Sequence, residues 1–168
     1  MTPTSKTLLL GFGNPDRQDD GIAWHVLRAV AARMGLPAPI SDEDDFPQSE
    51  RVNFLFQLQL TPELAEEISR HERVCFVDAQ TGDIPAAVRL VELKCEFQRS
   101  PLTHHLTPQS LLAICDALYH VRPRAALLSL RGSAFGFSRD LSPASQELLP
   151  EALKLIEAWL GENADGGG

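Results

Sequence analysis

At three places in the sequence, side chains that could take part in a reaction lie directly before or after an apolar segment. The run LLLGFGNPDRQDDG, residues 8–21, carries Asn14, Asp16, Asp19 and Asp20 just after a glycine turn. Asp78 ends the apolar run VCFVDA, and the pair His104 and His105 precedes a segment of helical periodicity. Carboxylates and imidazoles can bind a divalent metal ion or transfer a proton near neutral pH. These residues predict metal-centred or acid–base chemistry.

Each of these candidates also has a structural interpretation. Asp19 and Asp20 can cap the helix that follows, because carboxylates complement the positive end of a helix dipole. Asp78 can cap the turn QTGD, although a carboxylate at the end of an apolar strand is costly unless something compensates its charge. A pair of histidines in a loop is often solvated surface. The other histidines, His25, His71 and His120, lie in or near predicted helices and are weaker candidates.

Several familiar site patterns are missing from the sequence. A dinucleotide fingerprint needs G-x-G-x-x-G, but Asp16 stands where the third glycine belongs. There is no H-E-x-x-H helix for zinc and no G-x-S-x-G turn for a serine nucleophile. The cysteines Cys75, Cys95 and Cys115 form no C-x-x-C pair and are predicted to be buried, reduced thiols.

The elements that must position these side chains follow from hydrophobic periodicity and from Gly and Pro punctuation. Strands are predicted over 6–13, 52–60, 74–79, 87–97 and 124–131. Helices are predicted over 21–34 and 61–70, and from 107 and 142 onward, the last with a kink near Pro150. Thr61 and Thr107, each followed by Pro, are the predicted N-caps of two of these helices, and the last helix is predicted to begin at Ser142-Pro143.

Alternation of strands and helices predicts an α/β fold with a mostly parallel sheet and helices on both of its faces. Ligands of such folds collect at the carboxyl ends of the strands. We therefore expect Asp20, Asp78 and His104 to follow the ends of three different strands at one edge of the sheet. Two carboxylates and one imidazole form a ligand set suited to nickel, zinc or cobalt.

Length and charge limit the class of protein. The chain has 168 residues, which predicts a single domain over 1–161 and a disordered tail over 162–168. Its 15 Lys and Arg against 23 Asp and Glu give a net charge of -8, which argues against a nucleic-acid partner. No apolar stretch approaches the roughly 18 residues of a membrane span, and MTPTSK lacks an apolar signal core. We expect a cytoplasmic protein without a membrane partner.

The order of the motifs resembles that of the hydrogenase maturation endopeptidases over nearly the whole chain. The runs that carry the resemblance are GFGNPDRQDDGIAWHVLRAV, FVDAQTG, HHLTPQSLLAICDAL and LSPASQELLPEALKLIEAW. Enzymes of this family remove the C-terminal peptide from the nickel-loaded precursor of a [NiFe]-hydrogenase large subunit. The resemblance implies the same hydrolase activity, that precursor as partner, and a three-layer, phosphorylase/hydrolase-like fold with a twisted, mostly parallel sheet of five strands.

The resemblance also implies a metal-binding and catalytic site. In the family, an acidic residue after the first strand, an Asp at the end of a central strand and a His before a later helix bind a metal ion. The matching positions are Asp20, Asp78 and His104, since the pattern H-x-L-x-P-x-x-L-L fits from His104 but not from His105. The substrate would carry the nickel, with no tightly bound metal in the free enzyme. Either a carboxylate or a metal-bound water would activate the attack on the peptide bond.

The chain departs from the family in two places, and two other functions stay open. Family members often have Glu at the position of Asp20 and a Gly-rich turn where this chain has FQLQLTPEL, which bears on substrate choice. The opening also resembles peptidyl-tRNA hydrolases, but RQDD replaces their Arg-His-Asn stretch, and the net charge suits tRNA poorly. A non-catalytic chaperone could use Asp20, Asp78 and His104 to hold a partner's metal site.

Overall fold

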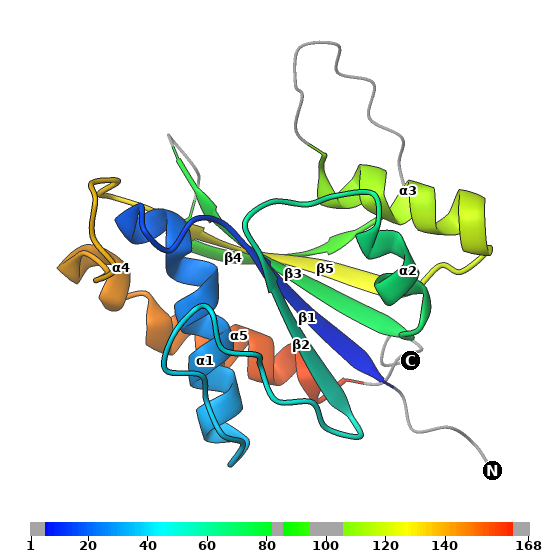
Figure 1. Ribbon diagram of the computed structural model, residues 1–168, viewed down its shortest axis with the longest axis horizontal. Helices are drawn as coiled ribbons and strands as arrows, with labels where there is room; N and C mark the ends of the chain where they lie inside the picture. The colour runs from blue at the N-terminus through cyan, green and yellow to red at the C-terminus, as the bar shows by residue number, and fades with distance from the viewer. Residues whose placement is uncertain (1–5, 82–85, 95–105, 163–168) are drawn as a thin grey trace.

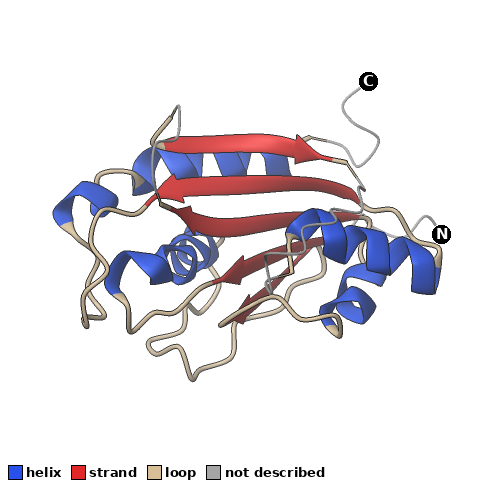
Figure 2. Ribbon diagram, turned by 90° about the horizontal axis from the view of Figure 1, so that it is seen from above, coloured by secondary structure: helices blue, strands red, loops and turns tan. Residues whose placement is uncertain are grey.

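Five strands form one twisted sheet between two layers of helices (Figures 1 and 2). The computed structural model describes residues 6–81, 86–94 and 106–162. The strands are β1 (Thr7–Phe12), β2 (Val52–Gln57), β3 (Arg73–Gln80), β4 (Val88–Leu93) and β5 (Arg124–Arg131), in the order β2-β1-β3-β5-β4. β4 is antiparallel to β5, and the other pairs are parallel. The predicted mostly parallel α/β fold is confirmed.

Helices cover both faces of the sheet, as predicted. α1 (Ile22–Arg33), α4 (Pro143–Gln146) and α5 (Leu149–Leu160) lie on one side, and α2 (Leu64–Ser69) and α3 (Pro108–Tyr119) on the other (Figure 1). Successive side chains of a strand point to opposite faces. Leu9 therefore packs in the core beneath α1 and α5, whereas Leu8 and Leu10 pack beneath α2 and α3. β1 is buried on both sides, which explains its continuous apolar sequence.

The predicted starts of two helices, at Thr107-Pro108 and Ser142-Pro143, are confirmed. The side chain of Thr107 accepts a hydrogen bond from the backbone N–H of Ser110 at 3.1 Å, at the start of α3. Ser142 accepts one from the N–H of Ser145 at 3.3 Å, at the start of α4. Both caps are followed by Pro in the first turn, where the missing N–H costs nothing.

Two helix predictions were wrong in detail. Thr61 does not cap α2 with its side chain, because Thr61 and Pro62 form a preceding turn and the helix starts at Leu64. Pro150 does not kink a continuous helix. It lies in the first turn of α5, so the chain makes the short helix α4, breaks, and begins again where Pro is tolerated.

The core cysteines are structural. Cys75 and Cys115 are both free and fully buried. Burial raises the pKa of the Cys75 thiol to about 12, so the reactive thiolate is suppressed at neutral pH. This confirms the prediction for these two residues, while Cys95 lies outside the described residues. Within the described part of the chain, no helix is long and apolar enough to cross a bilayer.

A buried arginine fastens the end of α5 to the sheet. Arg73 is 3% exposed, and its guanidinium lies 3.9 Å from the ring centroid of Trp159. It donates to the carbonyl oxygens of Trp159 and, at 2.9 Å, of Glu162. The Glu162 side chain in turn pairs with Arg124. The predicted disordered tail over 162–168 stays a prediction, since residues 163–168 lie outside the described part.

We expect Arg73→Ala to destabilise the protein by about 3 kcal/mol, because the last carbonyls of α5 lose their donor inside the protein. The free energy of unfolding in urea measures the effect. Arg51→Ala is the matched control, since Arg51 is an exposed arginine just before β2 and should change stability by less than about 0.5 kcal/mol. Equal losses in both variants would show that Arg73 does not anchor α5.

Candidate active site

Two of the predicted site residues lie at the carboxyl ends of neighbouring strands. Asp78 is near the end of β3, one residue beyond Val77, which pairs with Gly11 of β1. Asp20 lies in the 3-10 helix η1 (Gln18–Gly21), which follows the glycine turn after β1. Both strands run in the same direction, so their ends meet at one edge of the sheet. The structure thus brings these two carboxylates together.

The surroundings of Asp78 favour binding of a proton or a cation. Burial and then the negative charge of Asp20 raise the pKa of Asp78 to about 7, and a hydrogen bond from the N–H of Ala79 only partly offsets them. The Gln80 amide donates to Asp78 Oδ2 at 3.1 Å. None of the ion pairs in the described part of the chain includes Asp20 or Asp78. The pair therefore carries excess negative charge.

A tight turn sets the position of Asp20. The backbone N–H of Asn14 donates to Asp20 Oδ2 at 2.9 Å, which orients the carboxylate back toward the end of β1. Gly13 has a φ of 141°, and a Cβ atom there would lie 2.1 Å from the carbonyl oxygen of Asp20. Only glycine lets η1 approach the strand this closely. The G-x-G-N sequence thus serves the placement of a carboxylate.

Asp19 has a different role from its neighbour. Its carboxylate is completely buried and accepts hydrogen bonds from the N–H groups of Ser133 and Ala134, each at 2.8 Å. It also accepts from the N–H of Ser142 at 2.9 Å and from its hydroxyl at 2.7 Å. Burial acts to raise the pKa of Asp19, but these donors, the Ser142 hydroxyl first, outweigh it and lower the pKa to about 2. Asp19 therefore tethers the loop after β5.

The helix-cap interpretation of Asp19 and Asp20 is wrong. Neither η1 nor α1 has a side-chain cap at its start. Consecutive residues of a 3-10 helix point about 120° apart, so the two carboxylates face different surroundings, one the protein interior and the other the end of β3. The sequence signal for this division was the doubled Asp itself, since two adjacent carboxylates seldom share one role.

The loop after β5 is joined to the turn after β1 along its length. The N–H of Gln18 donates to the carbonyl of Ser138 at 2.8 Å, and the N–H of Asp19 to that of Ala134 at 3.0 Å. Arg139 pairs with Asp16 at 2.8 Å and with Asp42 at 2.7 Å. Asp16, a sequence candidate, is therefore a surface ion-pair partner. These contacts hold the backbone around Asp20 in one arrangement.

The third predicted residue, His104, lies outside the described residues, as does His105. The structure corrects one part of the expectation that His104 follows a strand end at the same edge as Asp20: the described strand before it, β4, does not end at that edge. β4 is antiparallel, so its last residue, Leu93, pairs with Ala125 near the start of β5, at the opposite edge. α3 then runs back against the direction of β5, so that its first residues, after Thr107, lie toward the edge with the two carboxylates (Figure 1). The role of His104 stays a prediction.

The remaining described histidines do not form a second site. His71 is buried, with Nδ1 donating to the Glu67 carbonyl at 2.8 Å and Nε2 accepting from the Asn53 amide at 2.8 Å. Burial lowers the pKa of His25, whose ring packs edge-on against Trp24. His120 ends α3 in the left-handed conformation. In the described ranges, no three His, Cys, Asp or Glu side chains gather as a metal site.

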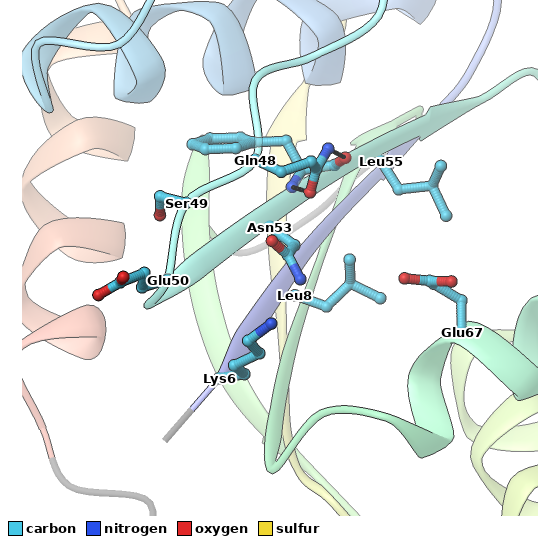
Figure 3. Close-up of a pocket in the computed structure, with 9 residues that line it drawn as sticks. Lys6, Leu8, Gln48, Ser49, Glu50, Asn53, Leu55 and Glu67 are labelled. Carbon is cyan, nitrogen blue, oxygen red and sulfur yellow. Dashed lines mark hydrogen bonds between the residues drawn. The ribbon is translucent and has the colours of Figure 1, made fainter. Parts of the chain in front are cut away.

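An open groove of about 630 Å³ lies away from the two carboxylates, beside the beginning of β2 (Figure 3). Its walls combine apolar side chains with scattered charges; they are Lys6, Leu8, Gln48, Ser49, Glu50, Asn53, Phe54, Leu55 and Glu67. Lys6 and the two glutamates come from separate segments of the chain, and His71 lies behind Asn53 rather than in the groove. The groove therefore lacks the concentrated charge found around Asp78.

Comparisons with known proteins found similar folds among solved structures. No protein-family model matches the sequence, and no curated protein matches it significantly. Among solved structures, the hydrogenase maturating endopeptidase HybD from E. coli is similar with a TM-score of 0.70 and 16% identity, over 92% of this chain and 91% of that one. The [NiFe] hydrogenase maturation protease HybD from Thermococcus kodakarensis is similar with a TM-score of 0.63 and 18% identity, over 92% and 99%. The hydrogenase 2 maturation peptidase from Thaumarchaeota archaeon has a TM-score of 0.63 and 16% identity, over 94% and 99%. This chain has the fold of the hydrogenase maturation endopeptidases.

Proposed function

We propose that the protein is an endopeptidase that removes the C-terminal peptide from the nickel-loaded precursor of a [NiFe]-hydrogenase large subunit. The observation that carries the proposal is the pair Asp20 and Asp78, placed together at the carboxyl ends of β1 and β3. The fold shared with maturation proteases over more than nine-tenths of the chain supports it. We also propose a cytoplasmic location. Cys75 and Cys115 form no disulfide in the described part of the chain, and disulfides are rare in the cytosol.

The chemistry of the pair fits recognition of a nickel ion that belongs to the substrate. The two carboxylates carry charge that no described Lys or Arg neutralises, and a divalent cation would relieve the repulsion that raises the pKa of Asp78. His104 would add an imidazole nitrogen from the segment before α3, which gives the mixed oxygen and nitrogen set that nickel accepts. Because three side chains leave coordination positions free, the ion would remain attached to the precursor and not to the free enzyme.

The residues themselves suggest how the bond is cut. Gln80 donates to Asp78 Oδ2 and so orients the carboxylate. This carboxylate can take a proton from a water molecule as the water attacks the peptide carbonyl, and can return the proton to the leaving amine. Asp20, oriented by the Asn14 N–H, contributes the negative charge that helps to raise the pKa of Asp78 in the free protein.

The direct test is to incubate the purified protein with nickel-loaded and nickel-free large-subunit precursors and to weigh the products by mass spectrometry. We expect the loaded precursor to become shorter by one C-terminal peptide and the nickel-free precursor to keep its mass. A precursor that binds the protein and keeps its full mass would instead support the metal-site chaperone. Release of the peptide from a peptidyl-tRNA ester would support the peptidyl-tRNA hydrolase alternative.

Substitution of the two adjacent histidines tests the assignment of His104. We expect His104→Ala to lower the rate of precursor cleavage by at least 100-fold, because one ligand of the nickel ion is lost. His105→Ala is the matched control and should retain most of the activity, as the pattern H-x-L-x-P-x-x-L-L requires. Single-turnover cleavage of the loaded precursor measures both rates. Equal losses would show that the motif alignment is displaced by one residue.

A further inference from the structure

The outer edge of β2 is the feature that carries a further inference. β2 is the first strand in the sheet order, and in the described part of the chain it pairs with β1 and, by an isolated bridge at Asn53, with Gln48. The carbonyls of Arg51 and Gln57 accept hydrogen bonds from β1 and the turn after it, from Thr7 at 2.9 Å and Gly13 at 3.1 Å. Because backbone groups alternate along a strand, the N–H and C=O groups of residues 52, 54 and 56 point outward.

The chain closes the first two of these outward positions with its own side chains. Ser49 pairs with the backbone of Val52, accepting from its N–H at 3.0 Å and donating to its carbonyl at 2.8 Å. The side-chain amide of Gln48 does the same for Phe54, at 3.3 Å and 3.0 Å (Figure 3). A side-chain amide in this place imitates a neighbouring strand and prevents another chain from pairing there.

The third outward position stays open. In the described part of the chain, neither the N–H nor the carbonyl of Phe56 has a hydrogen-bond partner on the outer side, and the N–H of Leu58, the first residue after β2, has no partner either. The ring of Phe56 lies against Gly11 on the α1 side of the sheet, whereas the Leu58 side chain is 66% exposed. The open segment Phe56–Leu58 is at the carboxyl end of β2, the same edge of the sheet that carries Asp20 and Asp78.

We propose that an extended segment of the protein substrate pairs with Phe56–Leu58 as a short added strand. This inference rests on the proposed function, since it takes the substrate to be a polypeptide. Unpaired N–H and carbonyl groups on a strand edge are matched by the backbone of another extended segment. The opening is only about three residues long, because Gln48 and Ser49 close the remainder. Such a short opening suits a peptide tail better than the edge of a second folded copy, whose stable interface needs on the order of 1,600 Å².

Sheet geometry sets the distance between a segment paired with Phe56–Leu58 and the two carboxylates. Neighbouring strands are about 4.8 Å apart, so an added strand would lie about 10 Å from β1 and about 14 Å from β3. An extended chain advances about 3.3 Å per residue. The residues that pair with β2 would therefore lie about three to four positions from the peptide bond held between Asp20 and Asp78. A substrate with fewer residues in this stretch could not pair with β2 and place its peptide bond between Asp20 and Asp78 at the same time.

The test removes the N–H that directly follows the open position of β2. Leu58→Pro deletes the N–H of Leu58 and blocks pairing there, while Gln57 keeps the extended conformation that a residue before Pro prefers. Using the nickel-loaded precursor, we expect KM to rise at least tenfold, kcat to change less than twofold, and the melting temperature to stay within 2 °C of wild type. Leu58→Ala is the matched control: it keeps the N–H and should stay within threefold of the wild-type KM. An unchanged KM in Leu58→Pro, with wild-type cleavage intact, overturns the strand pairing but leaves the proposed function standing.

Hydrogen exchange of the wild-type protein gives a second readout that does not depend on cleavage. On addition of the precursor, we expect the amide protons of Phe56 and Leu58 to exchange at least tenfold more slowly, with less change at Asn53, whose amide already faces β1. No slowing overturns the pairing even if the precursor is cut. Slowing without any cleavage supports the pairing and contradicts the endopeptidase. Slowing that depends on protein concentration alone assigns the edge to a second copy and overturns the proposal.

Discussion

Asp78→Asn is expected to abolish precursor cleavage and, in metal-free buffer, to raise the melting temperature. Burial and the charge of Asp20 raise the pKa of Asp78 from 3.8 to about 7, so the ionised carboxylate destabilises the folded protein. Full conversion of that rise gives about 4 kcal/mol, and solvent access to the half-buried group reduces it, so we expect a gain of about 1–3 kcal/mol. Asn still accepts the hydrogen bond from Gln80 but cannot take a proton from water or bind nickel as an anion.

The pH dependence of this stabilisation follows from the sign of the pKa change. Above a pH of about 7, Asp78 is ionised in both the folded and the unfolded chain, and Asp78→Asn should show its full gain. As the pH falls toward 3.8, the folded protein binds the proton first and the gain shrinks to nothing. Thermal melts at several pH values in the presence of chelator measure this. Asp45→Asn, an exposed carboxylate, is the control and should show no gain.

Asp20→Asn completes the same prediction. Asn can still accept from the N–H of Asn14, so the turn after β1 should keep its geometry and the melting temperature should change by less than 2 °C. Loss of the negative charge should lower cleavage of the nickel-loaded precursor at least 100-fold. Normal cleavage with unchanged melting in Asp20→Asn would rule out the role of Asp20 as a ligand. Lower melting temperatures in both Asn variants would indicate a structural pair.

Asp19→Asn is expected to cost about 2–4 kcal/mol of stability, the reverse of the change at Asp78. The Asp19 carboxylate accepts all four of its hydrogen bonds. An Asn at this position must replace one of the two oxygens with an NH₂ group. That NH₂ would face either the N–H of Ser142 at the Oδ1 position or the three donors from Ser133, Ala134 and the Ser142 hydroxyl at the Oδ2 position. The loop after β5 should detach and loosen the turn that carries Asp20. Cleavage should therefore fall together with stability.

Urea unfolding and precursor cleavage, measured on the same preparations, test the role of Asp19. Asp16→Asn is the matched control, because Asp16 is an exposed carboxylate three residues earlier whose partner Arg139 is also exposed. Such surface pairs contribute about 0–1 kcal/mol. A loss of less than 0.5 kcal/mol in Asp19→Asn would mean that the buried hydrogen bonds do not hold the loop.

The sequence by itself determined the elements whose causes are local. Apolar runs and period-two alternation predicted all five strands, with bounds identical to the structure for β5. The helix starts at Thr107 and Ser142 were recognisable because a cap bonds only three residues ahead. The placement of Asp20 and Asp78 at one sheet edge also followed from the sequence, since parallel strands put their carboxyl ends together.

Only the tertiary structure decided the features that depend on distant partners. The direction of β4 comes from its pairing with β5, which the alternation of β4 does not encode. Asp19 and Asp20 are identical residues, and what separates them is a set of donors 114 to 123 positions away. Arg73 meets its carbonyl partners 86 to 89 positions later in the chain. Hydrophobic periodicity reports which face of an element is buried, but the free energy of a buried charge depends on donors that reach it only when the chain has folded.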